Sequence, residues 1–160
     1  MKNSVKAILF VALLSIVGLT SCSTSYKKLP TTDTVVISNE LDGSLTVRVW
    51  GIGRNIADAT NQARKNIVHE VIFQGVRNGN STYTMTPLVS EANARTKYAD
   101  YFDDFFSDRG DFDDFVYKID ARAFSKTVKI DRMQVAVCVT LRVDRPGLQR
   151  RLREDGIIKK

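Results

Sequence analysis

The chain has 160 residues, a formal net charge of +6 and 43% hydrophobic residues, as expected for one globular domain with a short extension. Its charged fraction of 26% is close to average, which excludes a wholly disordered chain, a collagen-like repeat and a coiled coil. One histidine and two cysteines exclude a multi-histidine metal site and a four-thiolate zinc site. We therefore expect neither a metal nor another cofactor.

Residues 1–21 have the pattern of a signal peptide. Lys2 and Lys6 precede an apolar run over residues 7–19. This run is shorter than the about 20 residues that cross a bilayer core, and it has the length of a secretory hydrophobic region. It ends at Leu19-Thr20-Ser21-Cys22, a leucine and two small residues before a cysteine, which resembles the lipobox of bacterial lipoproteins. The alternatives are a free cysteine after an ordinary signal peptide and an uncleaved anchor helix.

The lipobox resemblance implies a mature protein that begins at Cys22 and is held in a membrane by acyl chains, such as palmitate, on its thiol and terminus. By the sorting rules of such lipoproteins, Ser23 in place of an aspartate implies the outer membrane. The lack of acidic residues just after Cys22 favours its periplasmic face. Removal of Lys2 and Lys6 leaves a mild net charge of about +4, which in an envelope protein argues against a nucleic-acid partner.

Residues 22–43 are polar and are predicted to form a lipidated, flexible tether, although 35–37 can add a short edge strand. The folded domain is expected over 44–145. Apolar residues alternate over 45–50, which predicts a strand. A helix then begins after the N-cap Asn55 and stops at Gly75. Its buried face repeats every three or four residues, at Ile56, Ala59, Ala63, Ile67 and Val71.

The second half of the domain is predicted to hold another helix and a hairpin. The helix opens at Pro87 to Ser90 and ends before Gly110, with residues 111–115 as one more turn or a connector. A strand over 116–129 changes phase at Phe124-Ser125-Lys126, which suggests a bulge. A turn at Asp131-Arg132 leads into a strand over 133–143, and 146–160 form a basic tail or a short helix.

These elements predict an α+β fold: a three- or four-stranded antiparallel sheet with two helices packed on one face, in the order β-α-α-β-β. The sequence Gly51-Ile52-Gly53 invites a comparison with dinucleotide-binding turns. However, Ile56 stands where the third Gly or Ala belongs, and no second parallel strand with an acidic ribose ligand follows. A tight strand-to-helix turn explains the two glycines better.

A strand ending in Gly-x-Gly, a helix with Ala59 and Ala63 and a later long hairpin resemble a family of small envelope domains. This family comprises flagellar-associated lipoproteins and the amino-terminal part of FlgT. The resemblance covers about Ser44 to Val143 and rests on residues 49–53, the two alanines and residues 135–141. It implies a non-catalytic lipoprotein or assembly module and provides no catalytic residue.

The segment 100–115 interleaves aspartates with aromatic residues. A calcium loop is one interpretation, but residues 108–113 do not have the ligand order of an EF-hand, and a solvated acidic face over buried aromatics explains the pattern better. A third interpretation is an exposed aromatic anchor with an acidic rim, because the aromatics exceed what one helix face can bury. We predict this partner surface at Tyr101, Phe102, Phe106, Phe112, Asp103 and Asp104.

Three further features have ordinary explanations. The basic residues that gather from Arg142 to Lys160 can meet lipid phosphates or cell-wall carboxylates, form a solvated face, or offset the aspartates. His69 is expected on an exposed helix face, without a catalytic partner. Cys138 is expected in the core as a small hydrophobic residue.

The sequence therefore predicts a non-enzymatic outer-membrane lipoprotein that acts as an accessory or scaffold subunit in the envelope, in a secretion or motility complex. Its expected partners are the membrane, through the anchor, and an envelope protein. The alternative is a small periplasmic ligand carrier or envelope enzyme that uses a pocket between the helices and the sheet. A deep, polar-lined pocket that contains His69 or a carboxylate would favour that alternative.

Overall fold

Residues 34–77, 84–119 and 125–159 are described by the computed structural model, and they form an α+β fold, which confirms the predicted class. The signal peptide, Cys22 and most of the expected tether lie outside these ranges. The elements are β1 (Val35–Asn39), β2 (Leu45–Gly53), α2 (Ile56–His69), the π-helix η1 (Glu70–Gln74), β3 (Val76–Arg77), β4 (Thr84–Met85), α3 (Ala94–Lys97), α4 (Ala99–Phe105), the 3-10 helix η2 (Asp111–Phe115), β5 (Val116–Lys118), β6 (Lys126–Lys129), β7 (Val135–Val143) and α5 (Arg145–Glu154).

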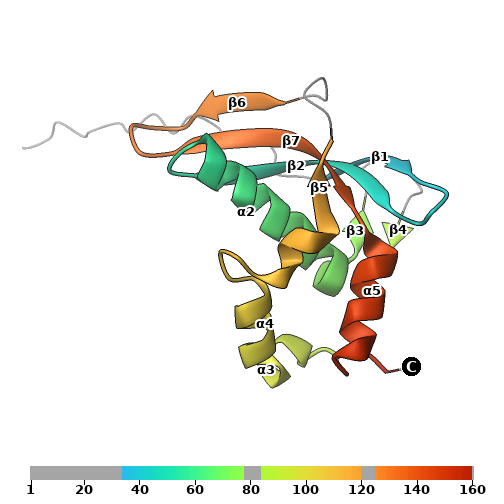
Figure 1. Cartoon of the computed structure of the whole chain (residues 1–160). Coiled ribbons are helices and arrows are strands. Elements are labelled where there is room, and N and C mark those ends of the chain that lie inside the picture. The colour runs from blue at the N-terminus through green and yellow to red at the C-terminus, as the bar shows by residue number, and fades with distance from the viewer. Residues whose placement is uncertain (1–33, 78–83, 120–124, 160) are drawn as a thin grey trace, which may run out of the picture.

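The main sheet is antiparallel and is built around the long pair β2 and β7, with β1 on the outer edge of β2. The expected strand over 116–129 is two short strands, β5 and β6, which pair with different parts of β7 along its other edge. The sheet therefore has five strands, of which β5 and β6 lie end to end along the same edge of β7. The position of Phe124, where a bulge was predicted, lies outside the described residues. Figure 1 shows the helices on one side of this sheet.

Helix α2 packs directly on the sheet, at the two glycines of β2. A Cβ atom on Gly51 would lie 2.0 Å from the Ala59 carbonyl oxygen, and one on Gly53 would lie 2.4 Å from the Ala59 nitrogen. Both glycines belong to β2, so they make room for the helix backbone within the strand instead of forming a turn after it. Asn55 caps α2 as predicted, because its side chain accepts a hydrogen bond from the Asp58 N–H.

The predicted second helix is wrong in its first part. Residues 87–93 are not helical, and two short helices, α3 and α4, replace the single expected one. The reason is a competing set of hydrogen bonds: the N–H groups of Leu88 and Val89 donate to the carbonyls of Val71 and Ile72. This segment therefore satisfies backbone groups near the end of η1 instead of starting a helix.

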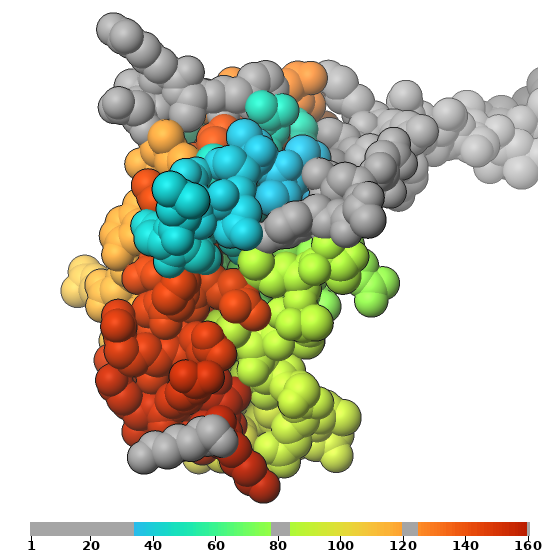
Figure 2. All heavy atoms as spheres, turned by 90° about the vertical axis from the view of Figure 1, so that its right-hand side faces the viewer, coloured from blue at the N-terminus to red at the C-terminus, as the bar shows by residue number. Residues whose placement is uncertain are grey.

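The packed domain extends beyond the expected limits of 44 and 145. At its start, β1 pairs with β2. At its end, α5 is capped by Asp144, which accepts from the Gly147 N–H, and it buries Leu148 and Leu152 completely. Figure 2 shows α5 beside the chain segment that leads into α3, both below β1 and β2. The C-terminal residues are thus part of the core and not a tail.

Candidate functional site

The aromatic residues of the segment 100–115 form an internal cluster, which corrects the predicted partner surface. Phe102 and Phe112 are only 2% and 1% exposed, and Tyr101 and Phe106 are partly buried. The rings contact one another in a continuous set between α2, α4 and η2, with centroid distances such as 4.7 Å between Phe73 and Phe102. Two layers of helix cover these aromatics, which a single helix face could not do.

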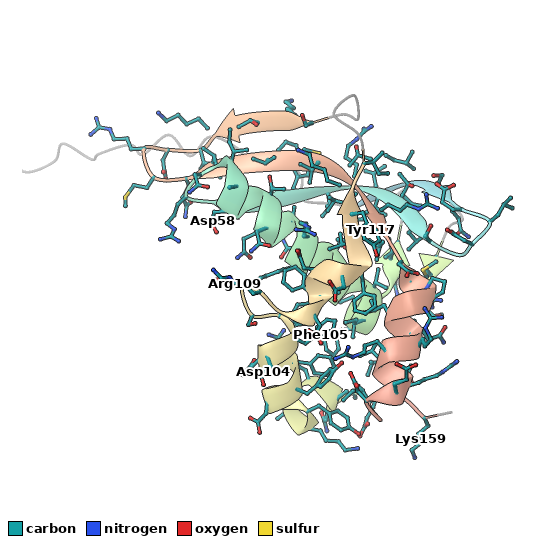
Figure 3. All side chains as sticks on the ribbon, viewed as in Figure 1. Asp58, Asp104, Phe105, Arg109, Tyr117 and Lys159 are labelled. Atoms are coloured by element: carbon teal, nitrogen blue, oxygen red, sulfur yellow. The ribbon has the colours of Figure 1, made fainter. Side chains whose placement is uncertain are left out.

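The outer side of α4 carries the acidic part of the predicted surface. Asp100, Asp103 and Asp104 are exposed and recur at the spacing of one helix face, and we call them the acidic face. None of the three forms an ion pair with the residues that the structure describes. Figure 3 shows Asp104 on the outer side of α4, whereas Phe105 lies on the side towards η2.

Three of the other four aspartates of the segment, Asp108, Asp111 and Asp113, form ion pairs with α2 or α5. Asp108 binds Lys65 at 2.9 Å, and this hydrogen bond holds the pKa of Asp108 below its ordinary value. Asp113 pairs with Arg64 of α2. Asp111 pairs with Arg151 of α5, so one arginine of the basic C-terminal region does offset an aspartate. These pairs are structural contacts between α2, η2 and α5.

A groove lies between α2 and the short helices α3 and α4. It is lined by Lys65, His69, Arg95, Phe102, Asp103 and Phe106. Arg95 Nη1 lies 2.8 Å from His69 Nε2, and the imidazole ring packs against Phe73 at 4.8 Å and Phe106 at 5.9 Å between centroids. His69 is therefore half-buried, although an exposed position was predicted. The residue after it begins the π-helix η1, a backbone irregularity that often accompanies functional sites.

The electrostatics of the groove keep His69 neutral near pH 7. Partial burial of the ring, followed by the positive charge of Arg95, lowers the pKa of His69 from its ordinary value. Because Arg95 can only donate, Nε2 of His69 must accept, and the ring proton then lies on Nδ1. The groove thus presents a guanidinium supported by a neutral ring, with the Lys65 ammonium nearby.

A second depression lies between α5 and the chain before α3, on the face of the molecule that Figure 2 turns towards the viewer. Its walls include the apolar Leu88 and Ile158 and the basic Arg153 and Lys159. A third contact set joins α4 to α5: Tyr101 donates to Asp155, and Arg151 binds the same carboxylate at 2.7 Å. Burial, then the Asp155 hydrogen bond, raises the pKa of Tyr101 above its ordinary value.

The remaining candidates do not add a site. Cys138 is 1% exposed, as predicted, and burial raises the pKa of its thiol. Within residues 34–77, 84–119 and 125–159, no group of three His, Cys, Asp or Glu side chains is placed to hold a metal ion. No helix in this part of the chain is long and apolar enough to cross a membrane.

Sequence reasoning missed Arg95, the residue that completes the groove. It lies 26 positions after His69, in the short helix α3 that follows the segment where the helix prediction was wrong. No local sequence pattern predicts the contact between Arg95 and His69, because it depends on how α3 is placed relative to α2.

Comparison of the chain with protein-family models, curated proteins and solved structures finds no match. The resemblance to lipoproteins and to the FlgT amino-terminal domain therefore stays a prediction.

Proposed function

We propose that this chain is a lipoprotein anchored through Cys22 in the outer membrane, on its periplasmic side, and that it is not an enzyme. It acts there as an accessory or scaffold subunit of an envelope complex for secretion or motility. The lipobox-like residues 19–22 support the anchor. The acidic face of α4 supports the binding role and is the observation on which that role rests.

Repulsion between the carboxylates of the acidic face destabilises α4 when no partner is bound. Like charges three and four residues apart on a helix destabilise it by about 0.2–0.5 kcal/mol per pair. Asp100, Asp103 and Asp104 have this spacing, and they have no cationic partner in the described residues. On the opposite side of α4, the aromatic cluster packs the helix against η1 and η2. A rigid, unpaired anionic stripe suits a basic surface on a partner protein.

A second candidate function is favoured by the groove beside His69. It contains both His69 and the carboxylate of Asp103, as a ligand carrier or small enzyme would require. It lies between helices, however, and not between the helices and the sheet, and it is an open depression. The interior of the domain is filled with side chains. We therefore place this candidate second.

Photo-cross-linking in intact cells tests the binding role. A cross-linking amino acid at position 104 samples the acidic face, and one at the exposed Glu154 of α5 is the matched control. We expect a discrete protein adduct from position 104 that is absent from position 154. Asp100→Lys should reduce its yield, because it reverses one charge of the stripe without touching the groove. No adduct at 104, or the same adducts from both positions, would reject this function.

A further inference from the structure

Arg95 is an exposed cation held in place without a counter-charge. Its Nη1 donates to His69 Nε2 at 2.8 Å, which fixes the guanidinium over the end of α2. In the described part of the chain, Arg95 forms no ion pair with a carboxylate. A guanidinium has five N–H donors in a planar fork, so most of them stay available. By contrast, Lys65 already binds Asp108.

We propose that the groove between α2, α3 and α4 is a binding site for an organic carboxylate. The guanidinium of Arg95, beside His69, donates two parallel hydrogen bonds to this ligand. The groove shares only Asp103 with the acidic face of α4, and the proposal does not depend on the lipid anchor. It assigns a ligand class to a groove that was not predicted from the sequence.

The surroundings of Arg95 favour a carboxylate over a larger or more highly charged anion. The partly buried Phe106 provides most of an apolar wall for the carbon part of a ligand, since Phe102 also lines the groove but is only 2% exposed. Asp103 at the rim repels negative charge, so a monoanion meets less repulsion than a dianionic phosphate. Lys65 lines the groove on the α2 side, but its charge is already paired with Asp108, so Arg95 is the cation that a ligand meets. A carboxylate also matches the fork with two parallel hydrogen bonds.

His69 reports on binding, because it is the only histidine of the chain. The experiment uses the full chain in a neutral detergent, with an affinity tag that contains no histidine. The imidazole signals are followed by NMR during addition of N-acetylphenylalanine. The amide of the same compound, with sodium chloride added to equal ionic strength, is the matched neutral ligand, and inorganic phosphate is the third arm.

We expect a saturable shift of the His69 signals with the carboxylate and none with the amide. The pKa of His69 should rise when the carboxylate is bound, because a negative charge then faces the ring. Arg95→Gln should weaken binding by about tenfold or more, as expected for loss of charge-assisted hydrogen bonds. Arg54→Gln, which removes an exposed arginine outside the groove, should bind as the native chain does.

Three results would overturn the proposal. The first is an equal shift with the amide, which would indicate contact with the apolar wall alone. The second is unchanged affinity in Arg95→Gln, with its unfolding midpoint unchanged as the check on folding. The third is phosphate binding as tight as that of the carboxylate, which would indicate a general anion site.

Discussion

Gly51 is the residue at which the sheet and α2 come closest. Its missing side chain leaves room for the Ala59 carbonyl and the Ala63 backbone, 2.0 and 2.4 Å from where a Cβ would stand. Neither of these backbone atoms can rotate away. Gly51 and the two alanines of α2 therefore act together, and a change to any of them must move the helix.

Gly51→Ala should destabilise the domain by at least the upper end of the about 1–3 kcal/mol typical of overpacked sites. Urea unfolding, followed by the fluorescence of Trp50, the single tryptophan, measures this. Gly156→Ala is the control, because its Cβ would meet nothing within 4 Å and only its positive φ of 73° is unfavourable. We expect a cost of about 1 kcal/mol there. Equal costs for the two variants would contradict the close packing of α2.

His69 should make the stability of the domain depend on pH. Its pKa is lowered in the folded protein by burial and by Arg95, whereas in the unfolded chain it is about 6.5. The unfolded state therefore takes up a proton first as the pH falls. The stabilisation is fully present above about pH 6.5 and is lost as the pH falls through the folded pKa.

The comparison is between the native chain and His69→Phe, which keeps the ring contacts with Phe73 and Phe106. The free energy of unfolding is measured as the pH is lowered from 7.5 to the pH at which carboxylates begin to titrate. Over this range it should decrease more steeply for the native chain than for His69→Phe. Parallel curves for the two proteins would show that His69 is not perturbed as described.

For single residues, the sequence shows which side chains are apolar, but burial was not always predicted correctly from it. Most of the predicted buried face of α2 is confirmed, because its spacing is regular and Asn55 marks the start of the helix. Ile56 is the exception: it is the first residue of the helix and is 58% exposed. Phe112 was placed on a partner surface although it is 1% exposed. A helical period cannot reveal that η2 folds against α2 and buries the Phe112 ring there. The contact between this ring and Lys65 of α2 joins residues that are far apart in the sequence.

The helix α5 is the short helix that was one of the two predictions for residues 146–160, but it packs into a domain that was expected to end at residue 145. The abundance of arginine between 145 and 153 suggested a tail or a short helix outside the domain. Leu148 and Leu152, four residues apart, form a narrow apolar stripe that is fully buried. Asp144 and Pro146 mark the start of the helix, a signal that the sequence does contain.

Leu152→Ala should therefore destabilise the domain by about 2–5 kcal/mol, as for other buried leucines. Arg150→Ala, a change on the exposed side of the same helix, should stay within about 0.5 kcal/mol of the native chain. Urea unfolding of both variants decides the matter. A negligible effect of Leu152→Ala would mean that α5 is a dispensable tail after all.

The helices α3 and α4 show the opposite situation, in which a strong local signal was overruled. Residues 90–109 suit a helix, but Leu88 and Val89 bind carbonyls that η1 presents. The π-helix itself could not be predicted, because nothing in residues 70–74 distinguishes it from a continuing α-helix. The groove beside His69 depends on both features, which is why it was not foreseen.

At the scale of the whole molecule, the sheet order follows from the long β2 and β7 pair, and the α+β class was predictable from these two strands and α2. Pairing of Leu45 with Val143 and of Gly53 with Val135 aligns the apolar faces of both strands towards α2. The division of the last edge into β5 and β6 was not predictable, because both strands are short and gain their pairing only from β7.

The proposed function requires a folded domain that works from a membrane. The acidic face of α4 and the basic residues of α5 lie on different elements, so the net charge of +6 conceals two surfaces of opposite sign. Anchoring would raise the local concentration of the domain for a partner in the same envelope. Both proposed surfaces would then act at the membrane.

Mass spectrometry of the amino-terminal peptide from bacterial membranes tests the anchor most directly. The account predicts that the mature protein begins at Cys22 and carries a diacylglyceryl group on its sulfur, and that Cys22→Ala releases the domain from the membrane fraction. A Cys22 that is free and unmodified, or a chain that still begins at Met1, would contradict the proposed lipoprotein.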